Sequence, residues 1–327
     1  MSSPFKSTTL GNSINTFPDT VNRALIVDPG RPVISIWNSE ALFDAEAPLV
    51  ASFSSRGPNL LTPGILKPDI SAPGVEILSA WSPLTVQSLR EDDHRRVPYN
   101  ILSGTSVASP HVTGAAAYVK SVHPDWSPAA LMSSLITTAT PMRPDTTQEA
   151  EFAYGAGQVN PAGAVDPSLV YDTSELDYLH YVCRQGYNAT QIAALLTGTS
   201  ATCASLPVMA DQLNYPSIAV PVQNYGVGFS EVIARTATNV GPADSVYRAK
   251  ICSTSGIRIS VEPAKLAFSA AKKKMSFTVT VSGTLSHGVH GSLGASASIV
   301  WSDGKHHVRS PIYVFPQHLS SYTSTET

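Results

Sequence analysis

The chain has 327 residues, which is enough for two domains with substantial cores. Only 14% of the residues are charged and the formal net charge is -3, so the basic footprint of a nucleic-acid-binding protein is absent. No apolar run is long enough for a transmembrane helix. We therefore expect no nucleic-acid partner, no membrane partner, no metal and no cofactor. The composition makes no prediction about the oligomeric state.

The first ten residues are polar and lack the apolar core of a signal peptide. Taken alone, this beginning predicts either an intracellular protein or a chain whose N-terminus is missing. Residues 1 to about 45 show no clear period, although Val33–Trp37 is a candidate strand. The short apolar runs Val50–Ser54 and Val75–Ala80 are bounded by Gly and Pro, which predicts strands of a sheet covered on both faces. The charged stretch Leu84–Pro98 predicts a solvated loop.

Helices follow this region. The first is predicted from Ser106 to about His123, with Pro110 in its first turn, where a missing N–H costs least. Ser127 is expected to cap a second helix, which ends near Thr140. Pro128 occupies the first position of that helix, where proline is favoured. Two further short helices are predicted, over Ser174–Arg184 and Thr190–Leu196.

After Pro216 the apolar residues alternate with a period of two, as in half-buried strands. Asp303-Gly304 is a strong hairpin-turn signal between the last two strands. The basic run Lys272–Lys274 is interpreted as a hairpin tip rather than a binding patch. Several short strands over about 105 residues fit a β-sandwich. The expected strands are Val232–Thr238, Ser245–Ile251, Ile257–Val261, Met275–Val281, Ala297–Trp301 and His307–Val314.

The chain has three cysteines. A bridge between Cys183 and Cys203 would close a loop of about 20 residues and stabilise the fold by roughly 3 kcal/mol. Free buried thiols fit the sequence equally well, so both alternatives stay open. Asn188 begins the only N-glycosylation sequon, which matters only if the protein is secreted.

Ser106 is the strongest candidate for a functional residue. The run Tyr99–Ser103 enters a Gly-Thr-Ser turn, and a helix rich in small residues leaves it. Ser106 is thus expected at a helix N-terminus, where free backbone N–H groups and the helix dipole favour negative charge. A nucleophile for acyl transfer needs such a place, because the attacked carbonyl oxygen becomes an oxyanion. The elbow Gly-x-Ser-x-Gly of α/β-hydrolases does not fit, because residue 108 is alanine.

The stretch Gly104–Gly114 strongly resembles the serine motif of subtilisin-like proteases. Seven other segments resemble the plant, cucumisin-like branch of that family. The resemblance covers roughly residues 45 to 315 and its motifs are highly specific. These segments are Ser54–Asn59, Leu66–Gly74, Asn100–Ser106, Pro124–Ala129, Phe152–Gly157, Leu169–Asp172 and Leu213–Ser217.

The resemblance implies a secreted, apoplastic endopeptidase that acts on polypeptides. It divides the chain into a remnant of the upstream or protease-associated region (1–45), the C-terminal half of a subtilisin-like catalytic domain (46–212) and a fibronectin-III-like sandwich (213–327). The fold class implied is α/β, the C-terminal part of a doubly wound parallel sheet, followed by the all-β sandwich. Ser106 corresponds to the family's nucleophile and its backbone N–H to one oxyanion donor. Gly104 and Thr105 are expected beside it in the substrate and oxyanion site.

The family's other catalytic parts, which are the triad aspartate, the triad histidine and the oxyanion asparagine, have no counterpart in this sequence. It contains no His-Gly-Thr-His, and Asp172-Thr-Ser and Ser302-Asp303-Gly304 follow Ser106 in the wrong order, in predicted turns. His111 follows Ser106 by five residues, about 500° around a helix, so it should point away from the serine and pack under the sheet. His94, in a charged loop, and His123, at a helix end, are no better placed.

A serine without its base and orienter should give negligible peptidase activity, so we expect this chain alone to be inactive. The alternative hypothesis is a non-catalytic pseudo-enzyme or protein-binding module that uses the sandwich. A sheet without its earlier strands should leave the helix after Ser106 partly uncovered, while residues 213–318 should fold independently.

The sequence also departs from the family pattern. Val107, Ala108 and Ser109 replace the usual Met, Ser and Cys, which should leave the fold intact. Gln158 and Ser168 stand where the branch has His and Gly, and Ser168 is expected to strain a turn that prefers glycine.

Overall fold

The computed structural model describes residues 47–88, 92–143, 147–187, 189–195, 203, 213–286 and 293–321. The chain forms two compact units. One consists of residues up to 51 together with 75–103, and the other of residues 52–74 together with 104–327. The predicted strand Val33–Trp37 lies outside the described residues.

The first unit contains an antiparallel pair of short strands. Strand β1 (Ile77–Ala80) pairs with β2 (Tyr99–Leu102), with Ile77 opposite Leu102 and Ala80 opposite Tyr99. The prediction that Val75–Ala80 is covered on both faces is wrong, since Leu78 is 69% exposed and burial alternates along β1. The prediction of a strand at Val50–Ser54 is also wrong, because none of these residues is in a strand and residues 52–54 form a turn and a bend.

The helices of the second unit begin where local signals predict. Helix α1 (Thr105–Val122) and helix α2 (Pro128–Thr137) pack with α4 (Pro161–Ala164) around the buried Ala115, Val119, Leu135 and Ala164. The Ser127 hydroxyl caps α2 by accepting a hydrogen bond from the Ala130 N–H at 3.0 Å. The shorter helices are α3 (Glu151–Tyr154), α5 (Glu175–Arg184) and α6 (Ala189–Leu195).

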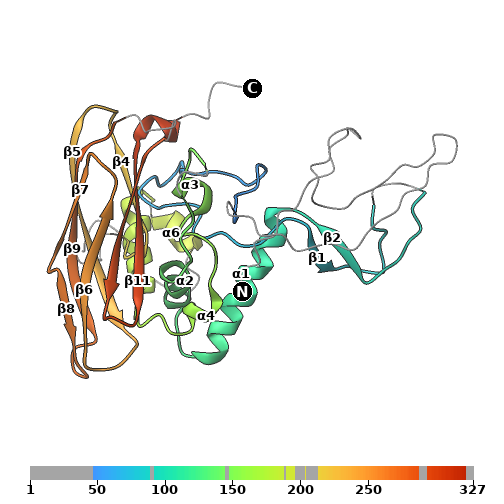
Figure 1. Cartoon of the computed structure of the whole chain (residues 1–327), viewed down its shortest axis with the longest axis horizontal. Coiled ribbons are helices and arrows are strands. Elements are labelled where there is room, and N and C mark those ends of the chain that lie inside the picture. Colours follow the sequence, from blue (N-terminus) through green and yellow to red (C-terminus); the bar gives the residue numbers. More distant parts are fainter. Residues whose placement is uncertain are drawn as a thin grey trace. The chain divides into compact units, whose positions relative to one another are not determined.

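Two sheets form the β-sandwich at the left of Figure 1. In one sheet the order is β4-β11-β10-β6-β8, with β4 parallel to β11 and the other pairs antiparallel. In the other sheet the order is β3-β5-β9-β7, all antiparallel. The strands are β3 (Leu169–Val170), β4 (Ile218–Val222), β5 (Gly228–Asn239), β6 (Ser245–Ser253), β7 (Ile257–Glu262), β8 (Lys265–Phe268), β9 (Lys274–Thr284), β10 (Ala295–Ser302) and β11 (His307–Pro316).

All six strands predicted in this region are present. The Asp303-Gly304 turn joins β10 to β11 as predicted, with Gly304 at φ 99°. The interpretation of Lys272–Lys274 as a hairpin tip is wrong in one respect. The turn Ser269–Lys272 connects β8 to β9, which belong to different sheets, so it is a corner of the sandwich.

Strand β3 belongs to the sandwich although it precedes the predicted boundary at residue 213. Leu169 pairs with Asn239 and Val170 with Thr238 at the end of β5. Leu169 and Tyr171 are buried in the same core as Trp301 of β10. The segment that follows α4 therefore gives the sandwich a strand and two core side chains, while the part of the chain that carries α1 to α6, here called the helical part, has core clusters of its own.

The segment that leads into β4 is fastened on both sides. The Asn214 amide donates to the carbonyls of Asp172 and Thr236 at 2.8 and 2.9 Å, and its oxygen accepts from the Thr236 N–H at 2.9 Å. The next residue, Tyr215, hydrogen-bonds through its hydroxyl to Asp69. The buried Arg235 donates to the Tyr215 carbonyl at 2.8 Å, so this segment ties the helical part to the sandwich.

Candidate active site

Ser106 lies in the first turn of α1, directly after β2, as the sequence predicts. Gly104 precedes the helix in an extended conformation, and its carbonyl accepts from the N–H groups of Val107 at 3.0 Å and Ala108 at 3.2 Å. Thr105 and Ser106 are both exposed. The first N–H groups of a helix have no partner within the helix, so this turn presents donors beside an exposed hydroxyl.

Gly74 supports the turn from a second segment. The Gly104 N–H donates to the Gly74 carbonyl at 2.8 Å. A Cβ on Gly74 would lie 2.9 Å from the Gly104 oxygen and 3.0 Å from the Ala108 Cβ, so only glycine allows this close approach. The serine turn is thus held between α1 and the segment that ends at Gly74.

That segment is itself anchored next to Gln158. Ser71 forms a parallel bridge with Gln158, through hydrogen bonds of 2.8 Å from its N–H to Gly157 and from the Val159 N–H to its carbonyl. Gln158 pairs on its other side with Thr140, at the end of the region that follows α2. The residues on either side of Gln158, which departs from the family pattern, therefore anchor the segment that ends at Gly74, while Gln158 itself bonds to Thr140.

The histidines near Ser106 in sequence have other partners. The prediction that His111 packs under the sheet is wrong, because its side chain is exposed and its Nδ1 lies 3.1 Å from the Val107 carbonyl. His123 stacks on Trp126 with ring centroids 3.9 Å apart, and its Nε2 lies 2.7 Å from the Val165 carbonyl. His94 is exposed in the charged loop. Within the described part of the chain, no hydrogen bond joins an imidazole to Ser106.

The two aspartates of the decoy motifs also have structural partners. Asp172 accepts from the Ser127 hydroxyl at 2.6 Å, at the start of α2. Asp303 lies 2.8 Å from the Nδ1 of His306, an aspartate–histidine pair that sequence reasoning did not find. The other ring nitrogen of His306 faces Asp166 at 3.2 Å rather than a hydroxyl. This pair therefore lacks the nucleophile that a catalytic triad requires.

The exposed flank of α1 carries apolar side chains. Tyr118 is 52% exposed and Val122 is 48% exposed. The helix after Ser106 is thus partly uncovered, as the sequence predicts.

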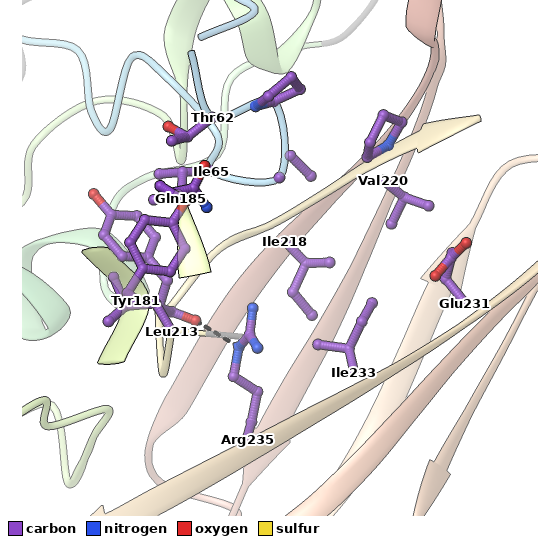
Figure 2. Close-up of a pocket in the computed structure, with 15 residues that line it drawn as sticks. Thr62, Ile65, Tyr181, Gln185, Leu213, Ile218, Val220, Glu231, Ile233 and Arg235 are labelled. Carbon is purple, nitrogen blue, oxygen red and sulfur yellow. Dashed lines mark hydrogen bonds between the residues drawn. The ribbon is translucent and has the colours of Figure 1, made fainter. Parts of the chain in front are cut away.

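A cavity of about 320 Å³ lies at the junction of α5 with the sandwich. Figure 2 shows Tyr181 and Gln185 of α5 facing Ile218 of β4 and Ile233 of β5 across it. Arg235 closes one end, with its guanidinium turned toward the chain near Leu213. None of its lining residues belongs to the serine turn, so we do not assign the cavity to the chemistry of Ser106.

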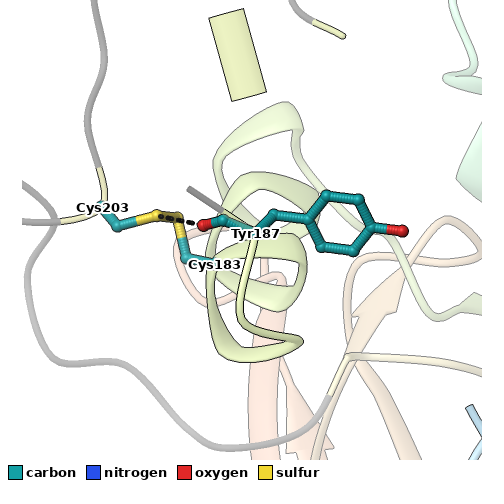
Figure 3. The surroundings of a disulfide bond; sticks show 3 residues. All are labelled: Cys183, Tyr187 and Cys203. Atoms are coloured by element: carbon teal, nitrogen blue, oxygen red, sulfur yellow. Dashed lines mark hydrogen bonds between the residues drawn. A yellow bond between two sulfur atoms is a disulfide. The ribbon is translucent and has the colours of Figure 1, made fainter. Parts of the chain in front are cut away.

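A disulfide joins Cys183 at the end of α5 to Cys203, with Cα atoms 5.6 Å apart (Figure 3). The Cys203 Sγ lies 3.8 Å from the Tyr187 carbonyl oxygen. Cys252 is a free, exposed cysteine. Asn188, the predicted glycosylation site, lies outside the described residues.

Among the described residues, no group of three or more His, Cys, Asp or Glu side chains is arranged to hold a metal ion. No described helix is long and apolar enough to cross a membrane.

Comparison with known families places the serine turn in context. Residues 10–157 match the family model described as "Subtilase family", and residues 212–314 match a fibronectin type-III domain. The chain belongs to the subtilase family. The fold class predicted from the sequence is therefore confirmed as a subtilase segment followed by an all-β, fibronectin-III-like region.

Several subtilisin-like proteases of Arabidopsis thaliana are similar to this chain. Subtilisin-like protease SBT4.8 is 46% identical over 288 residues, which is 87% of this chain and 40% of that protein. SBT4.15 is 47% identical over 280 residues, or 82% of this chain and 36% of that protein. SBT4.3 is 44% identical over 317 residues, or 95% of this chain and 42% of that protein. This subtilase chain thus spans about two fifths of the length of these relatives.

Solved structures add little. A FixG-related protein from Vibrio parahaemolyticus matches 28% of this subtilase chain and 96% of its own length, at 6% identity with a TM-score of 0.21. A likeness of that size carries no argument.

Two residues of this subtilase would not be singled out from the sequence. Glu151 is a buried acid on α3, and His306 bridges two aspartates from distant segments. The only local hint is a glutamate placed among Phe152, Ala153 and Tyr154 in an apolar segment. Asp303 precedes His306 by only three residues, but the second aspartate, Asp166, precedes it by 140 residues, so the local sequence does not indicate the bridge.

Proposed function

We propose that the chain supplies the serine-bearing part of a secreted, apoplastic endopeptidase that cleaves polypeptides through an acyl-enzyme at Ser106. The observation that carries this proposal is the exposed Ser106 hydroxyl in the first turn of α1, with Gly104 bonded to Gly74 behind it. Membership of the subtilase family supports the reaction class, and the activity of the longer relatives is carried over here only as a proposal.

In the proposed reaction, the Ser106 Oγ attacks the carbonyl carbon of the scissile peptide bond while its proton passes to an imidazole base. The carbonyl oxygen becomes an oxyanion, which the Ser106 backbone N–H stabilises together with the polarity of the helix N-terminus. The C–N bond then breaks, the amine leaves with the proton, and water hydrolyses the ester to restore Ser106. Gly104 and Thr105 would line the same part of the site.

The imidazole base, the carboxylate that orients it and the oxyanion amide have no motif in this sequence. We propose that residues outside these 327 supply all three in the active enzyme. Removing the base from a serine protease lowers kcat by a factor of about 10⁶, because the triad acts as a unit. The 327-residue chain alone should therefore be inactive.

We also propose that the chain consists of a remnant of the upstream or protease-associated region (1–45), the C-terminal half of the catalytic domain (46–212) and the sandwich (213–327).

We further propose that Asn188 is glycosylated in the secreted protein. Peptide mapping of protein recovered from the apoplast tests this modification. We expect a glycan on the peptide that contains Asn188.

The test is covalent labelling with a fluorophosphonate, which reacts with activated serines. The chain alone should remain unlabelled. A fusion in which the part of SBT4.8 that precedes its match is joined to this chain should be labelled at Ser106 and should cleave casein. The matched control is the same fusion with Ser106→Ala, which should lose both signals.

Labelling of Ser106 in the chain alone would overturn the predicted inactivity. A folded fusion that is neither labelled nor active would overturn the proposal, and would favour a non-catalytic, protein-binding module that uses the sandwich.

A further inference from the structure

Two buried or half-buried proton-binding groups sit where the helical part meets the sandwich. Glu151 belongs to α3 and faces β10, while His306 belongs to the β10–β11 turn and faces the segment after α4. Both contacts lie within the same compact unit, and each joins residues at least 140 positions apart in the sequence. The state of these two groups thus bears on how the two layers hold together.

Glu151 is a carboxyl group with little access to water. It is 2% exposed, and its Oε2 accepts a hydrogen bond from the Ser296 hydroxyl of β10 at 2.6 Å. The preceding residue, Ala150, has a φ of 45°, a conformation that L-residues rarely adopt. The turn that carries Glu151 is therefore held in place by its surroundings rather than by local preference.

The groups that face Glu151 do not neutralise it directly. Tyr154 lies on the same helix and Arg309 approaches from β11, while Tyr313 of β11 faces Tyr154. Arg309 donates to the Ala156 carbonyl at 2.8 Å, and among the described residues no ion pair joins it to Glu151. A buried carboxylate without a direct cationic partner is costly, and burying the neutral carboxyl costs much less.

His306 has the opposite surroundings. Its side chain is 9% exposed, and its two ring nitrogens lie 2.8 Å from Asp303 and 3.2 Å from Asp166. Lys305 also approaches Asp166, at 3.7 Å, and Tyr247 is near Asp303. A neutral imidazole has one N–H and can donate to only one carboxylate, whereas an imidazolium donates to both. The two aspartates thus favour the protonated ring.

We propose that the contact between the helical part and the sandwich is more stable at acidic pH than at alkaline pH. A neutral Glu151 and a protonated His306 hold α3 and the β10–β11 turn in place, and loss of the two protons loosens both contacts.

The directions of the two pKa shifts agree with this geometry. Burial raises the pKa of Glu151 from 4.5 to about 7, because desolvation outweighs the Ser296 hydrogen bond and the attraction of Arg309. Partial burial by itself would lower the pKa of His306, but the hydrogen bonds to Asp303 and Asp166 outweigh it and raise the pKa above 6.5. Partial burial also opposes the shift at Asp303, where hydrogen bonds from His306 lower the pKa to about 2.

The two groups change stability in the same sense. The folded protein holds the Glu151 proton between pH 4.5 and about 7, where the unfolded chain has lost it, so stability falls as pH rises through that range. The stabilisation from His306 is complete below pH 6.5 and disappears as pH rises through the raised pKa of the folded state. The Glu151 shift alone corresponds to a change on the order of a hundredfold in the folding equilibrium.

The experiment uses the full 327-residue chain and measures urea unfolding and backbone hydrogen exchange at pH 5 and pH 8. The wild type should unfold at a lower urea concentration at pH 8 than at pH 5. Hydrogen exchange in residues 150–157 should speed up between these pH values by more than it does in free peptides. Glu151→Gln mimics the neutral carboxyl, so it should lose most of this difference by gaining stability at pH 8. His306→Gln should lose stability at pH 5 and change little at pH 8.

The matched controls are Glu149→Gln and His94→Gln. Glu149 lies two residues from Glu151 but bonds to Thr147 and Arg56, and the Thr147 hydrogen bond lowers its pKa. Both control variants should still be less stable at pH 8 than at pH 5, as the wild type is.

Carbon-13 NMR titration of the Glu151 carboxyl and the His306 ring in the wild type decides the matter if a variant fails to fold. A Glu151 midpoint at or below 4.5, a His306 midpoint at or below 6.5, or an unchanged pH dependence in Glu151→Gln would overturn the proposal.

Discussion

Ser168 shows how one residue can hold an unfavourable conformation in return for contacts. It is fully buried with a φ of 68°, which confirms the strain expected where the family has glycine. Its carbonyl accepts from the N–H groups of Val240 at 2.9 Å and Gly241 at 3.1 Å, and its hydroxyl bonds to Tyr247. A left-handed residue other than glycine costs about 1–2 kcal/mol, so the side-chain bond to Tyr247 offsets a real penalty.

Two substitutions separate the free-energy cost of the left-handed backbone at Ser168 from the contribution of its side-chain hydrogen bond. Ser168→Ala removes the bond to Tyr247 and keeps the strain, whereas Ser168→Gly removes both. We expect the alanine variant to be less stable than the glycine variant by about 1 kcal/mol, and less stable than the wild type. Urea unfolding of the three proteins at one pH measures this. Equal stability of the two variants would show that the backbone at residue 168 relaxes when the serine is lost.

Residues whose role depends on near neighbours could be predicted from the sequence. Ser127 caps α2 three residues away, and Ser106 follows from the order of strand, turn and helix. The role of Glu151 and the bridge from His306 to Asp166 could not be predicted, because Ser296 lies 145 residues from Glu151 and Asp166 lies 140 residues from His306. His111 was misplaced for the same reason, since its burial depends on what covers α1.

The start of helix α1 is in contact with a separate segment of the chain. Gly74 approaches so closely that an added Cβ would lie 2.9 Å from the Gly104 oxygen. The element boundary at Thr105 is thus set jointly by the helix and by the segment Leu66–Gly74. The sequence predicts the helix start from local preference, but not the contact that fixes its position.

Gly74→Ala should disturb the serine turn, and Gly114→Ala provides the matched control. Nothing lies within 4 Å of a Cβ placed on Gly114 of α1, so alanine there should stabilise the chain by about 0.5–1 kcal/mol. Alanine at Gly74 should destabilise it by about 1–3 kcal/mol and speed hydrogen exchange at Val107 and Ala108. Unfolding midpoints and exchange rates measure both. Unchanged exchange in Gly74→Ala would contradict a supporting role for this contact.

Among the described residues, the sandwich includes a strand that precedes residues 213–327, the region predicted to form it. Strand β3 adds Leu169 and Val170 to one sheet, and Tyr171 enters its core. Period-two alternation predicted the six longer strands, because each shows its pattern over several residues. A two-residue strand has no such pattern, and its pairing with β5 spans about 70 residues of sequence, so it could not be predicted.

The independent folding of residues 213–318 stays a prediction, and β3 sharpens its test. A polypeptide of residues 165–321 should be more stable than one of residues 213–321 by at least about 3 kcal/mol, because the shorter one leaves the spaces of Leu169 and Tyr171 unfilled. Thermal and urea unfolding of the two polypeptides check this. As a control, Tyr171→Ala in the longer polypeptide should remove much of the gain. Equal stability would mean that β3 contributes nothing to the sandwich.

The hydrogen bond between Gly74 and Gly104 has a consequence for protein engineering. It joins the residues that flank 75–103, so these residues form a loop closed at its base by this hydrogen bond. The position of the serine turn should therefore not depend on the length of the loop. The entropy of closing a loop rises slowly, by only about 0.6 kcal/mol for each doubling of its length. The exposed stretch around Leu84 is therefore a natural place to graft a tag or a reporter sequence without moving Ser106.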